Sequence, residues 1–464
     1  MLAVDASRWT LDSPLPDEAA LRNVAQLRRY NQQQATISID SAPPLPSRIG
    51  IIGAGIMGLA VALTHARRGL PVRLADACPE TLARARPAIR KMAASESIKS
   101  GSMGMADATA DAGDPAWLDR LAEQVTPVSS LEELSDCDLI FETVVEIADR
   151  KRELYARLEP HIRADAILAS NTSTLSISNL AAGLKHPQRF CGMHFFNPVS
   201  MRPLVEVVCG ERTSEAILGA VVAHVRRLGK LPLRVADRPG FLVNRLLMPY
   251  LNESLELLAA GATIGQIDQA AERFGMPLGP LALYDLIGID TSFYAGRGMW
   301  EAYPERITAS PMLRALVRRG RLGRKADAGF YGYETGSGER REDPTVTEVL
   351  EPYVRPRGPF PPHVLGQRLL LPVVLEATRL LSELPGYDVR DVDLAMLYGL
   401  GFPEQRGGLL FWADRLGAGQ ILQMLEPFQS LGPRYEPPQR LLAMARAGQT
   451  FYPESCPEKQ GRES

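Results

Sequence analysis

The feature that most constrains the fold is a glycine-rich turn near residue 50. The motif GAGIMG occupies residues 53–58, directly after a short apolar run at residues 49–52 and directly before an apolar stretch with helical spacing. A GxGxxG motif needs this context of strand, tight turn and helix, because its glycines permit the turn, admit a pyrophosphate close to the backbone and let the helix pack on the strand. We expect the turn to bind a dinucleotide through Gly53, Gly55, Ile56, Met57 and Gly58.

An acidic residue follows at the spacing that such a turn predicts. Asp76 ends the second predicted strand, residues 72–75, and lies 18 residues beyond Gly58. A carboxylate there accepts a hydrogen bond from a ribose 2′-hydroxyl and repels a 2′-phosphate, so the sequence favours NAD over NADP. The alternative is that Asp76 only caps the turn that follows it.

From Arg48 the chain alternates short apolar runs with longer amphipathic stretches. The clearest runs are residues 49–52, 72–75, 139–141, 166–169 and 204–208. Alternating strand and helix signals predict an α/β fold with a parallel, doubly wound sheet. After residue 240 the pattern changes to long apolar stretches with helical spacing, which predict an all-α region.

The helical region repeats itself. Asn244-Arg245, Pro249 and Glu253 recur as Gln367-Arg368, Pro372 and Glu376 at a constant offset of 123 residues, and the offset then drifts to 129 through Asp268 and Asp393, Gly275 and Gly401, and Asp285 and Asp414. We interpret this as a duplicated helical unit, although two similar amphipathic helices could also match by chance. The expected domains are a helical arm and linker at 1–47, a nucleotide-binding domain at 48–238, helical domains at 239–335 and 363–464, and a linker at 336–362.

Composition excludes several classes of function. The net charge of −2 gives no long-range attraction to nucleic acid or to anionic lipid. The five cysteines are scattered and lack CxxC spacing, so neither a disulfide framework nor a metal site is expected, and a reducing, cytoplasmic location fits best. No secretion signal and no apolar run long enough to span a membrane is expected.

A histidine and a carboxylate downstream suggest acid–base chemistry. His194 and Glu206 lie 12 residues apart in the stretch HFFNPVSMRPLVE. Alcohol oxidation needs a base for the hydroxyl proton while a nicotinamide takes the hydride, and a carboxylate can orient the imidazole that serves as that base. Taken alone, such a pair is as often a structural histidine beside an unrelated acid.

Four segments occur in order: GAGIMG at 53–58, SNTST at 170–174, HFFNP at 194–198 with Glu206 following, and PGFLVNRLL at 239–247. Together they closely resemble the NAD-dependent L-3-hydroxyacyl-CoA dehydrogenases, from about Arg48 to Tyr333. The second half, with YGLGFPEQRGG at 398–408, looks like the duplicated C-terminal domain of the fatty-acid oxidation complex α-subunit. The resemblance implies a Rossmann-type domain followed by two all-α C-terminal-type domains, and reversible oxidation of L-3-hydroxyacyl-CoA to 3-ketoacyl-CoA in β-oxidation. Since only 47 residues precede Arg48, no hydratase domain is expected.

The same resemblance implies roles for individual residues. His194 would be the acid/base and Glu206 its orienting partner, with Ser173 and Asn244 hydrogen-bonded around the substrate oxygen. Glu146, Lys151 and Asn171 would contact the cofactor, and Asn197 and Lys99 the substrate. Each has a structural alternative, since Ser173 and Glu146 could cap helices and Asn244 could bridge them.

Two departures from the family pattern leave the detailed cofactor geometry and the substrate open. Ile147 follows Glu146 where an asparagine is usual, and Met92 stands where a serine contacts the CoA moiety. The alternatives are another hydroxyacyl thioester, such as one bound to acyl-carrier protein, a 3-hydroxy acid, or a non-catalytic NAD-binding subunit with hydratase or thiolase partners. A monomer and a homodimer are both compatible with the duplication, and the second copy, with Gln367 at the place of Asn244, is expected to be noncatalytic.

Overall fold

The fold comes from a computed structural model, which describes residues 17–34, 44–103, 114–334, 337–355, 358 and 360–453, without the side chains of 96–103. The chain forms two compact units, Arg29–Leu242 and Met1–Arg28 with Val243–Ser464. In the described part, none of the helices is both long and apolar enough to cross a bilayer.

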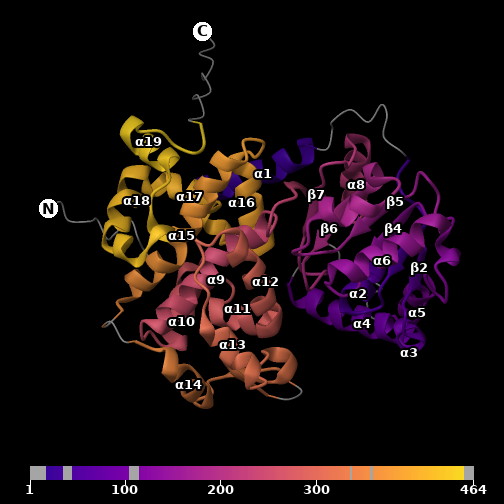
Figure 1. The fold of residues 1–464 in the computed structure, drawn as a ribbon, viewed down its shortest axis with the longest axis horizontal. Helices are drawn as coiled ribbons and strands as arrows, with labels where there is room; N and C mark the ends of the chain where they lie inside the picture. The colour runs from indigo at the N-terminus through magenta and orange to yellow at the C-terminus, as the bar shows by residue number, and fades with distance from the viewer. Residues whose placement is uncertain are drawn as a thin grey trace, which may run out of the picture. The chain divides into compact units, whose positions relative to one another are not determined.

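The first unit is built on an eight-stranded sheet (Figure 1), in the order β3-β2-β1-β4-β5-β6-β7-β8. The strands are β1 Ile49–Ile52, β2 Val72–Ala75, β3 Val125–Val128, β4 Leu139–Glu142, β5 Ile167–Ser170, β6 Phe190–Phe195, β7 Leu204–Cys209 and β8 Leu231–Ala236. The order reverses at β1, whose neighbours are β2 and β4. In sheets of this kind ligands bind beyond the carboxyl ends of the strands at such a reversal.

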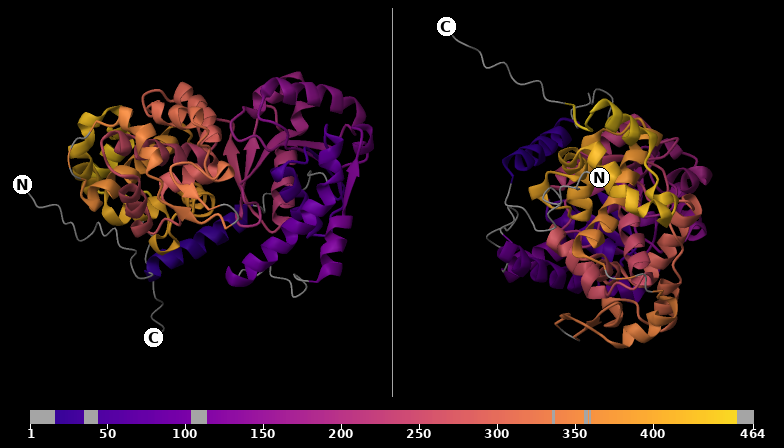
Figure 2. Two further views of the ribbon diagram at one scale, coloured as in Figure 1. Left: turned by 90° about the horizontal axis from the view of Figure 1, so that it is seen from below. Right: turned by 90° about the vertical axis from the view of Figure 1, so that its left-hand side faces the viewer.

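Helices cover both faces of this sheet (Figures 1 and 2). They are α2 Ile56–Ala66, α3 Pro79–Ala83, α4 Ala85–Met103, α5 Pro115–Glu123, α6 Ala148–Leu158, α7 Ile177–Leu180 and α8 Glu215–Arg227. Residues of α2, α4, α5 and α8 share one apolar core with the sheet, so these helices lie on one face. The buried strands read as continuous apolar runs because both faces are covered.

The expectation of an all-parallel sheet is wrong for its last two strands. β7 runs antiparallel to β6, whereas β8 runs parallel to β7. Only residues 196–203 connect β6 to β7, and so short a connection cannot carry the chain back for a parallel crossover. The predicted strands at 49–52, 72–75, 139–141, 166–169 and 204–208 are present, but β3, β6 and β8 were not predicted.

The second unit is almost entirely helical in its described residues. Its first set is α9 Val243–Ala259, α10 Ile264–Phe274, α11 Pro280–Ile287, α12 Ile289–Ala302 and α13 Pro311–Arg318, followed by strands β9 Gly332–Tyr333 and β10 Arg340–Arg341. Its second set is α15 Pro362–Glu383, α16 Val389–Leu394, α17 Leu409–Leu416, α18 Ala418–Leu425 and α19 Gln439–Ala447.

Buried aspartates show that the two sets repeat one design. Asp268 accepts hydrogen bonds from the backbone N–H groups of Leu281 and Ala282, at the start of α11. Asp393 accepts the same bonds from Leu410 and Phe411, at the start of α17. Burial raises the pKa of Asp268 to about 6 and that of Asp393 to about 7. Identical anchoring by residues predicted to correspond makes a chance match of two helices untenable.

The two sets pack through α9 and α15 by reciprocal ion pairs. Arg245 of α9 donates from Nε to Glu376 of α15 at 2.7 Å, and Arg368 of α15 donates from Nε to Glu253 of α9 at 2.6 Å. Each residue of one pair is the sequence counterpart of a residue in the other, at the same offset of 123. Such exchange of equivalent contacts is the signature of a two-fold interface, here within one chain.

Described residues outside these sets also form secondary structure. The arm expected within residues 1–47 contains helix α1, Glu18–Gln33, whose Asn23 donates a hydrogen bond to the carbonyl of Gly407 in the second helical set. The segment expected as a linker at 336–362 contains helix α14, Thr345–Leu350, and part of the two-stranded sheet. Apolar Val346 and Leu350 of α14 are buried, which explains why this polar stretch folds.

Candidate active site

The glycine turn has the geometry that its motif predicts. Gly53 has φ +107°, a conformation that L side chains avoid, and a Cβ at Gly58 would lie 1.8 Å from the carbonyl oxygen of Gly53. These two glycines are therefore required by the protein itself. A Cβ at Gly55 would meet nothing within 4 Å, so packing within the described part of the protein does not require a glycine there. Ile56 is 71% exposed and Met57 packs against the core.

Asp76 lies at the end of β2 and holds the turn. Its Oδ2 accepts a hydrogen bond from the N–H of Ala54 at 2.7 Å, and its Oδ1 accepts one from Cys78 at 2.8 Å. The second bond is the turn cap that the structural alternative predicted, and the first links the carboxylate directly to the glycine turn. Each oxygen keeps a lone pair for a further donor such as a ribose hydroxyl.

A buried hydrogen-bond network surrounds Glu142 at the end of β4. Glu142, which is fully buried, accepts hydrogen bonds from Lys151 Nζ at 2.6 Å, Tyr155 Oη at 2.6 Å and Ser170 Oγ at 2.8 Å. Lys151 is 1% exposed, so its ammonium faces this network, and it differs in that respect from the cofactor contact that the sequence suggested. The charge still reaches the site, because Nζ also lies 3.4 Å from the Glu146 carboxylate.

Glu146 organises the loop that follows β5. Its Oε1 accepts hydrogen bonds from Thr172 Oγ1 at 2.6 Å and from the N–H groups of Ser173 and Thr174 at 2.8 and 3.1 Å. Burial opposes ionisation of Glu146, but the Lys151 charge and these donors outweigh it and lower its pKa. Glu146 therefore does not cap α6, whose N-cap Ile147 has no side-chain hydrogen bond.

The same loop is held from its other end by Asp237, which the sequence analysis missed. Asp237 accepts hydrogen bonds from Ser176 Oγ and from the N–H groups of Ile177 and Ser178 at the start of α7. The N-cap of α7 is Ser176, so the capping alternative for Ser173 does not apply. The position of Asp237, between a strand and the PGF sequence, was the only available signal.

His194 and Glu206 form a hydrogen-bonded pair. They are register partners in the antiparallel β6–β7 ladder, which places both side chains on one face. The distance from His194 Nδ1 to Glu206 Oε2 is 2.8 Å, and Glu206 Oε1 accepts a hydrogen bond from the N–H of Leu242 at 3.0 Å. Glu206 is fully buried. A carboxylate whose two oxygens are both hydrogen-bonded in this way fixes the orientation of the imidazole ring and favours a proton on Nδ1.

Aromatic side chains surround the imidazole. The ring centroid of His194 lies 4.4 Å from that of Phe196 and 5.8 Å from that of Phe241, and His194 is 6% exposed. Its Nε2 has no hydrogen-bond partner in the described part of the chain. Phe241 has φ +49°, a strained conformation that follows Gly240 and precedes the N–H of Leu242 that binds Glu206.

The other predicted residues belong to both units. Asn171 accepts a hydrogen bond from the N–H of Phe195, next to His194, and Asn197 is exposed after β6. Asn244 is the second residue of α9 in the helical unit and is half-buried. Lys99 lies in α4, but its side chain is outside the described residues. Met92, at the expected serine position, packs against the apolar core of the sheet.

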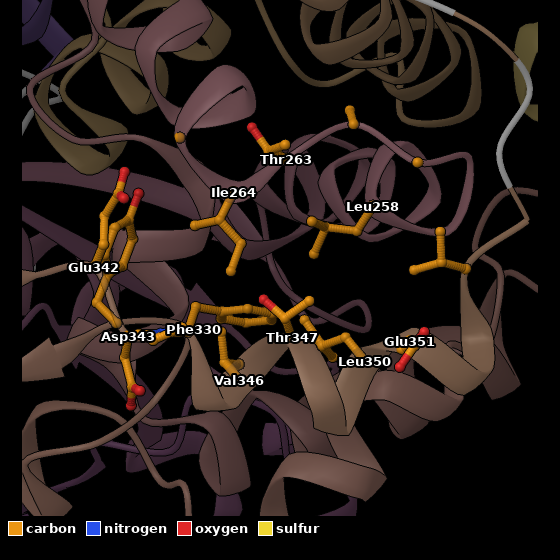
Figure 3. Close-up of a pocket in the computed structure, with 16 residues that line it drawn as sticks. Leu258, Thr263, Ile264, Phe330, Glu342, Asp343, Val346, Thr347, Leu350 and Glu351 are labelled. Atoms are coloured by element: carbon orange, nitrogen blue, oxygen red, sulfur yellow. The ribbon is translucent and has the colours of Figure 1, made fainter.

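A cavity of about 700 Å³ lies within the helical unit (Figure 3). Leu258 and Ile264 face Thr347 and Leu350 of α14 across it. Its described lining includes none of the predicted site residues. Chemistry is therefore a better guide to the candidate site than cavity size, because the hydrogen-bonded pair of His194 and Glu206 is absent from this lining.

A Rossmann sheet with a glycine turn, an acidic residue after β2 and a histidine–carboxylate pair in the strands beyond the reversal defines a nicotinamide-dependent dehydrogenase. Family models agree. The 3-hydroxyacyl-CoA dehydrogenase NAD-binding domain matches residues 48–238, and the C-terminal domain of the same family matches residues 240–333. The chain belongs to the 3-hydroxyacyl-CoA dehydrogenase family, and its cofactor is NAD.

Individual relatives support this assignment. The chain is 35% identical over 435 residues to the fatty acid oxidation complex subunit alpha of Ectopseudomonas oleovorans, covering 93% of this chain and 59% of that one. The chain thus spans about three-fifths of the length of this curated relative. It resembles the solved (S)-3-hydroxybutyryl-CoA dehydrogenase of Ralstonia eutropha, at 32% identity and a TM-score of 0.55, over 62% of this chain and all of that one. It also resembles the Escherichia coli 3-hydroxybutyryl-CoA dehydrogenase, at 26% identity and a TM-score of 0.72, over 87% and 98% of the two chains.

Proposed function

We propose that this protein catalyses the reversible oxidation of an L-3-hydroxyacyl-CoA to the 3-ketoacyl-CoA with NAD. The observation that carries the proposal is the 2.8 Å hydrogen bond between His194 and Glu206, in a domain that matches the NAD-binding model of this family. The names of the solved relatives, which act on 3-hydroxybutyryl-CoA, support the same substrate class.

In this proposal His194 is the proton acceptor. With the Nδ1 proton donated to Glu206, the lone pair of Nε2 is available for the proton of the 3-hydroxyl group. NAD, when bound, supplies the acceptor for the hydride that leaves C3. Glu206 stabilises the imidazolium that forms, and the N–H of Leu242 keeps its carboxylate in place. Reduction of the ketone uses the same groups in reverse.

Binding roles follow from the loops around the pair. Gly53, Gly55, Gly58 and Asp76 would hold the cofactor's pyrophosphate and ribose. Glu146 and Lys151 act by positioning the loop that bears Ser173, which we propose as a hydrogen-bonding group for the substrate oxygen. We retain Asn244, Asn197 and Lys99 as proposed substrate contacts, and Asn171 as a support for the strand that carries His194.

Features of the wider protein are proposed on the same basis. The second helical set is noncatalytic, because Gln367 replaces Asn244 and no paired histidine accompanies it. The relation to complex subunits suggests partners that supply or consume the thioester, such as a hydratase or a thiolase, and a cytoplasmic setting. Whether the reciprocal α9–α15 pairing leaves the protein monomeric is tested by its mass in solution.

The experiment that tests the proposal is formation of NADH, followed by absorbance, with L-3-hydroxybutyryl-CoA and the corresponding acyl-carrier-protein thioester in parallel. We expect turnover with the CoA thioester and NAD, and a much lower kcat/KM with NADP because Asp76 repels a 2′-phosphate. Turnover only with the carrier-protein thioester would transfer the assignment to that substrate. No turnover with either thioester, together with NAD binding, would support a non-catalytic subunit.

A further inference from the structure

A second, polar cavity lies in the helical unit where both helical sets meet the segment between them. Its volume is about 290 Å³, and its lining includes the guanidinium-bearing residues Arg355, Arg368 and Arg434, the hydroxyl-bearing Tyr353 and Ser430, and Glu256. Arg368 and Arg434 are largely buried, with side chains 5% and 11% exposed, so their charges need nearby negative charge, whereas Arg355 is exposed.

The positive charges of two of the three guanidinium groups are already balanced by carboxylates. Arg368 and Arg434 donate from Nε to opposite oxygens of Glu253 at 2.6 and 3.0 Å. Arg434 also lies 3.4 Å from the carboxylate of Glu256. Glu253 is fully buried, so this group of two cations and two anions is fixed in place and neutral.

Arg355 is the unbalanced charge. Its backbone N–H donates a hydrogen bond to the carbonyl of Ala259 at 2.7 Å. Its side-chain Nη1 donates to the carbonyls of Pro352 and Val354 at 3.0 and 2.8 Å. These bonds hold the guanidinium against its own turn. In the described part of the chain no carboxylate pairs with Arg355, and its side-chain hydrogen bonds come from Nη1, which leaves Nε and Nη2 for another acceptor.

We propose that this cavity binds a small phosphate-type oxyanion, distinct from the dinucleotide, with Arg355 as its principal ligand. The edge of a guanidinium group that presents Nε and one Nη matches two oxygens of a phosphate, and the hydroxyl groups of Tyr353 and Ser430 can add donors. The cavity suits a pyrophosphate or the terminal phosphate of a nucleotide but is too small for a whole dinucleotide. Occupancy ties the segment after α14 to α9, α15 and the turn at residues 433–435.

The test is isothermal titration of the full chain with sodium pyrophosphate in saturating NAD, which blocks the glycine turn as a competing anion site. We expect one pyrophosphate to bind per chain. Arg355→Ala should weaken that binding at least tenfold, because it removes charge-assisted hydrogen bonds. Arg355→Lys keeps the positive charge but loses the paired N–H donors of the guanidinium group, so its affinity for pyrophosphate should lie between those of the wild type and Arg355→Ala. Arg319→Ala, at an exposed arginine of the same unit, is the matched control and should bind like the wild type.

The outcomes separate the sources of the anion and can overturn the proposal. Competition of AMP with pyrophosphate identifies a nucleotide phosphate as the occupant, and binding without such competition identifies a free oxyanion. Absence of binding at millimolar pyrophosphate, or equal binding by the Arg355→Ala and wild-type proteins, contradicts the site. Dehydrogenase activity is unaffected by any of these results, so failure here is independent of the proposed function.

Discussion

At the residue scale, the register of one hairpin decides the chemistry. His194 and Glu206 are 12 residues apart in sequence, yet they face one another because β6 and β7 pair with these residues in register. A slip by one residue would turn one side chain to the opposite face and separate the pair. The strained turn at Phe241 then places a backbone donor on Glu206.

Two other histidines of the nucleotide-binding unit are buried in contact with each other. His65 of α2 and His224 of α8 are fully buried, with their Nε2 atoms 3.0 Å apart. Burial lowers the pKa of His65 to about 4 and that of His224 to about 3. Both rings are therefore neutral in the folded protein at pH 7.

This pair predicts acid sensitivity. In the unfolded chain both histidines titrate near pH 6.5, so the folded state is favoured fully above that pH and loses stability as the pH falls toward 4. Each histidine contributes a slope of about 1.4 kcal/mol per pH unit to the free energy of unfolding in that window. His224→Gln should halve the slope due to the pair, measured by urea unfolding between pH 6 and 4.5.

The control is His363→Gln, at an exposed histidine of α15. It should leave the slope of the nucleotide-binding unit unchanged. An identical pH dependence for the wild type and His224→Gln would mean that the buried rings do not carry this effect.

At the element scale, the strand–turn–helix unit from β1 to α2 assigns different tasks to its glycines. Gly58 is needed so that α2 can lie against the turn, because its Cβ would lie 1.8 Å from a carbonyl oxygen. Gly55 has open space around its absent side chain. Substitution of Gly58 should therefore affect folding, whereas substitution of Gly55 should affect cofactor binding alone.

Gly55→Ala should leave the melting temperature within about 2 °C of the wild type and weaken NAD binding at least about tenfold, the loss expected when one charge-assisted hydrogen bond of about 1.5 kcal/mol is removed. Gly58→Ala should weaken binding and lower the melting temperature together. Fluorescence titration with NAD and thermal unfolding measure the two effects. Unchanged NAD affinity in Gly55→Ala would remove that glycine from the cofactor site.

Local patterns explain which elements the sequence could predict. The turn at 53–58 and the strand before Asp76 follow from motif and spacing, and the duplicated helices follow from paired identities such as Glu253 and Glu376. The strand β6 and the reversed direction of β7 could not be predicted, because pairing partners are set by tertiary contacts that no local window contains.

The site residues also divide into those that local sequence could predict and those that depend on tertiary contacts. The sequence paired His194 with Glu206, and the structure places the two in hydrogen-bond contact. The burial of Lys151 against Glu142 could not be predicted, because it depends on the packing of α6 on the sheet. Asp237 was missed because its partners at the start of α7 lie about 60 residues away. The fold class was predictable, but the network that supports the site was not.

At the scale of the whole molecule, the helical unit is stabilised by the exchange of equivalent ion pairs. Arg245 is 2% exposed and pairs with Glu376 and Glu383, and its guanidinium lies 4.9 Å from the ring of Tyr303. A buried carboxylate that loses its partner is strongly destabilising.

Arg245→Ala should lower the free energy of unfolding of the helical unit by about 3 kcal/mol, the lower end for a broken buried pair, because Arg306 still lies 3.0 Å from Glu376. Arg297→Ala, which breaks an exposed pair with Glu301, should cost well under 1 kcal/mol. Denaturant unfolding of both variants measures the difference. Equal stability of the two would show that the reciprocal pairs do not hold the helical sets together.

The proposed transfer of the substrate proton to His194 is tested most directly by comparing His194→Ala with the wild type in single-turnover oxidation of L-3-hydroxybutyryl-CoA at saturating NAD. We expect the variant to react more slowly by about two to four powers of ten, with the NAD dissociation constant unchanged. Formation of NADH by the variant at a near-normal rate would show that His194 is not the proton acceptor.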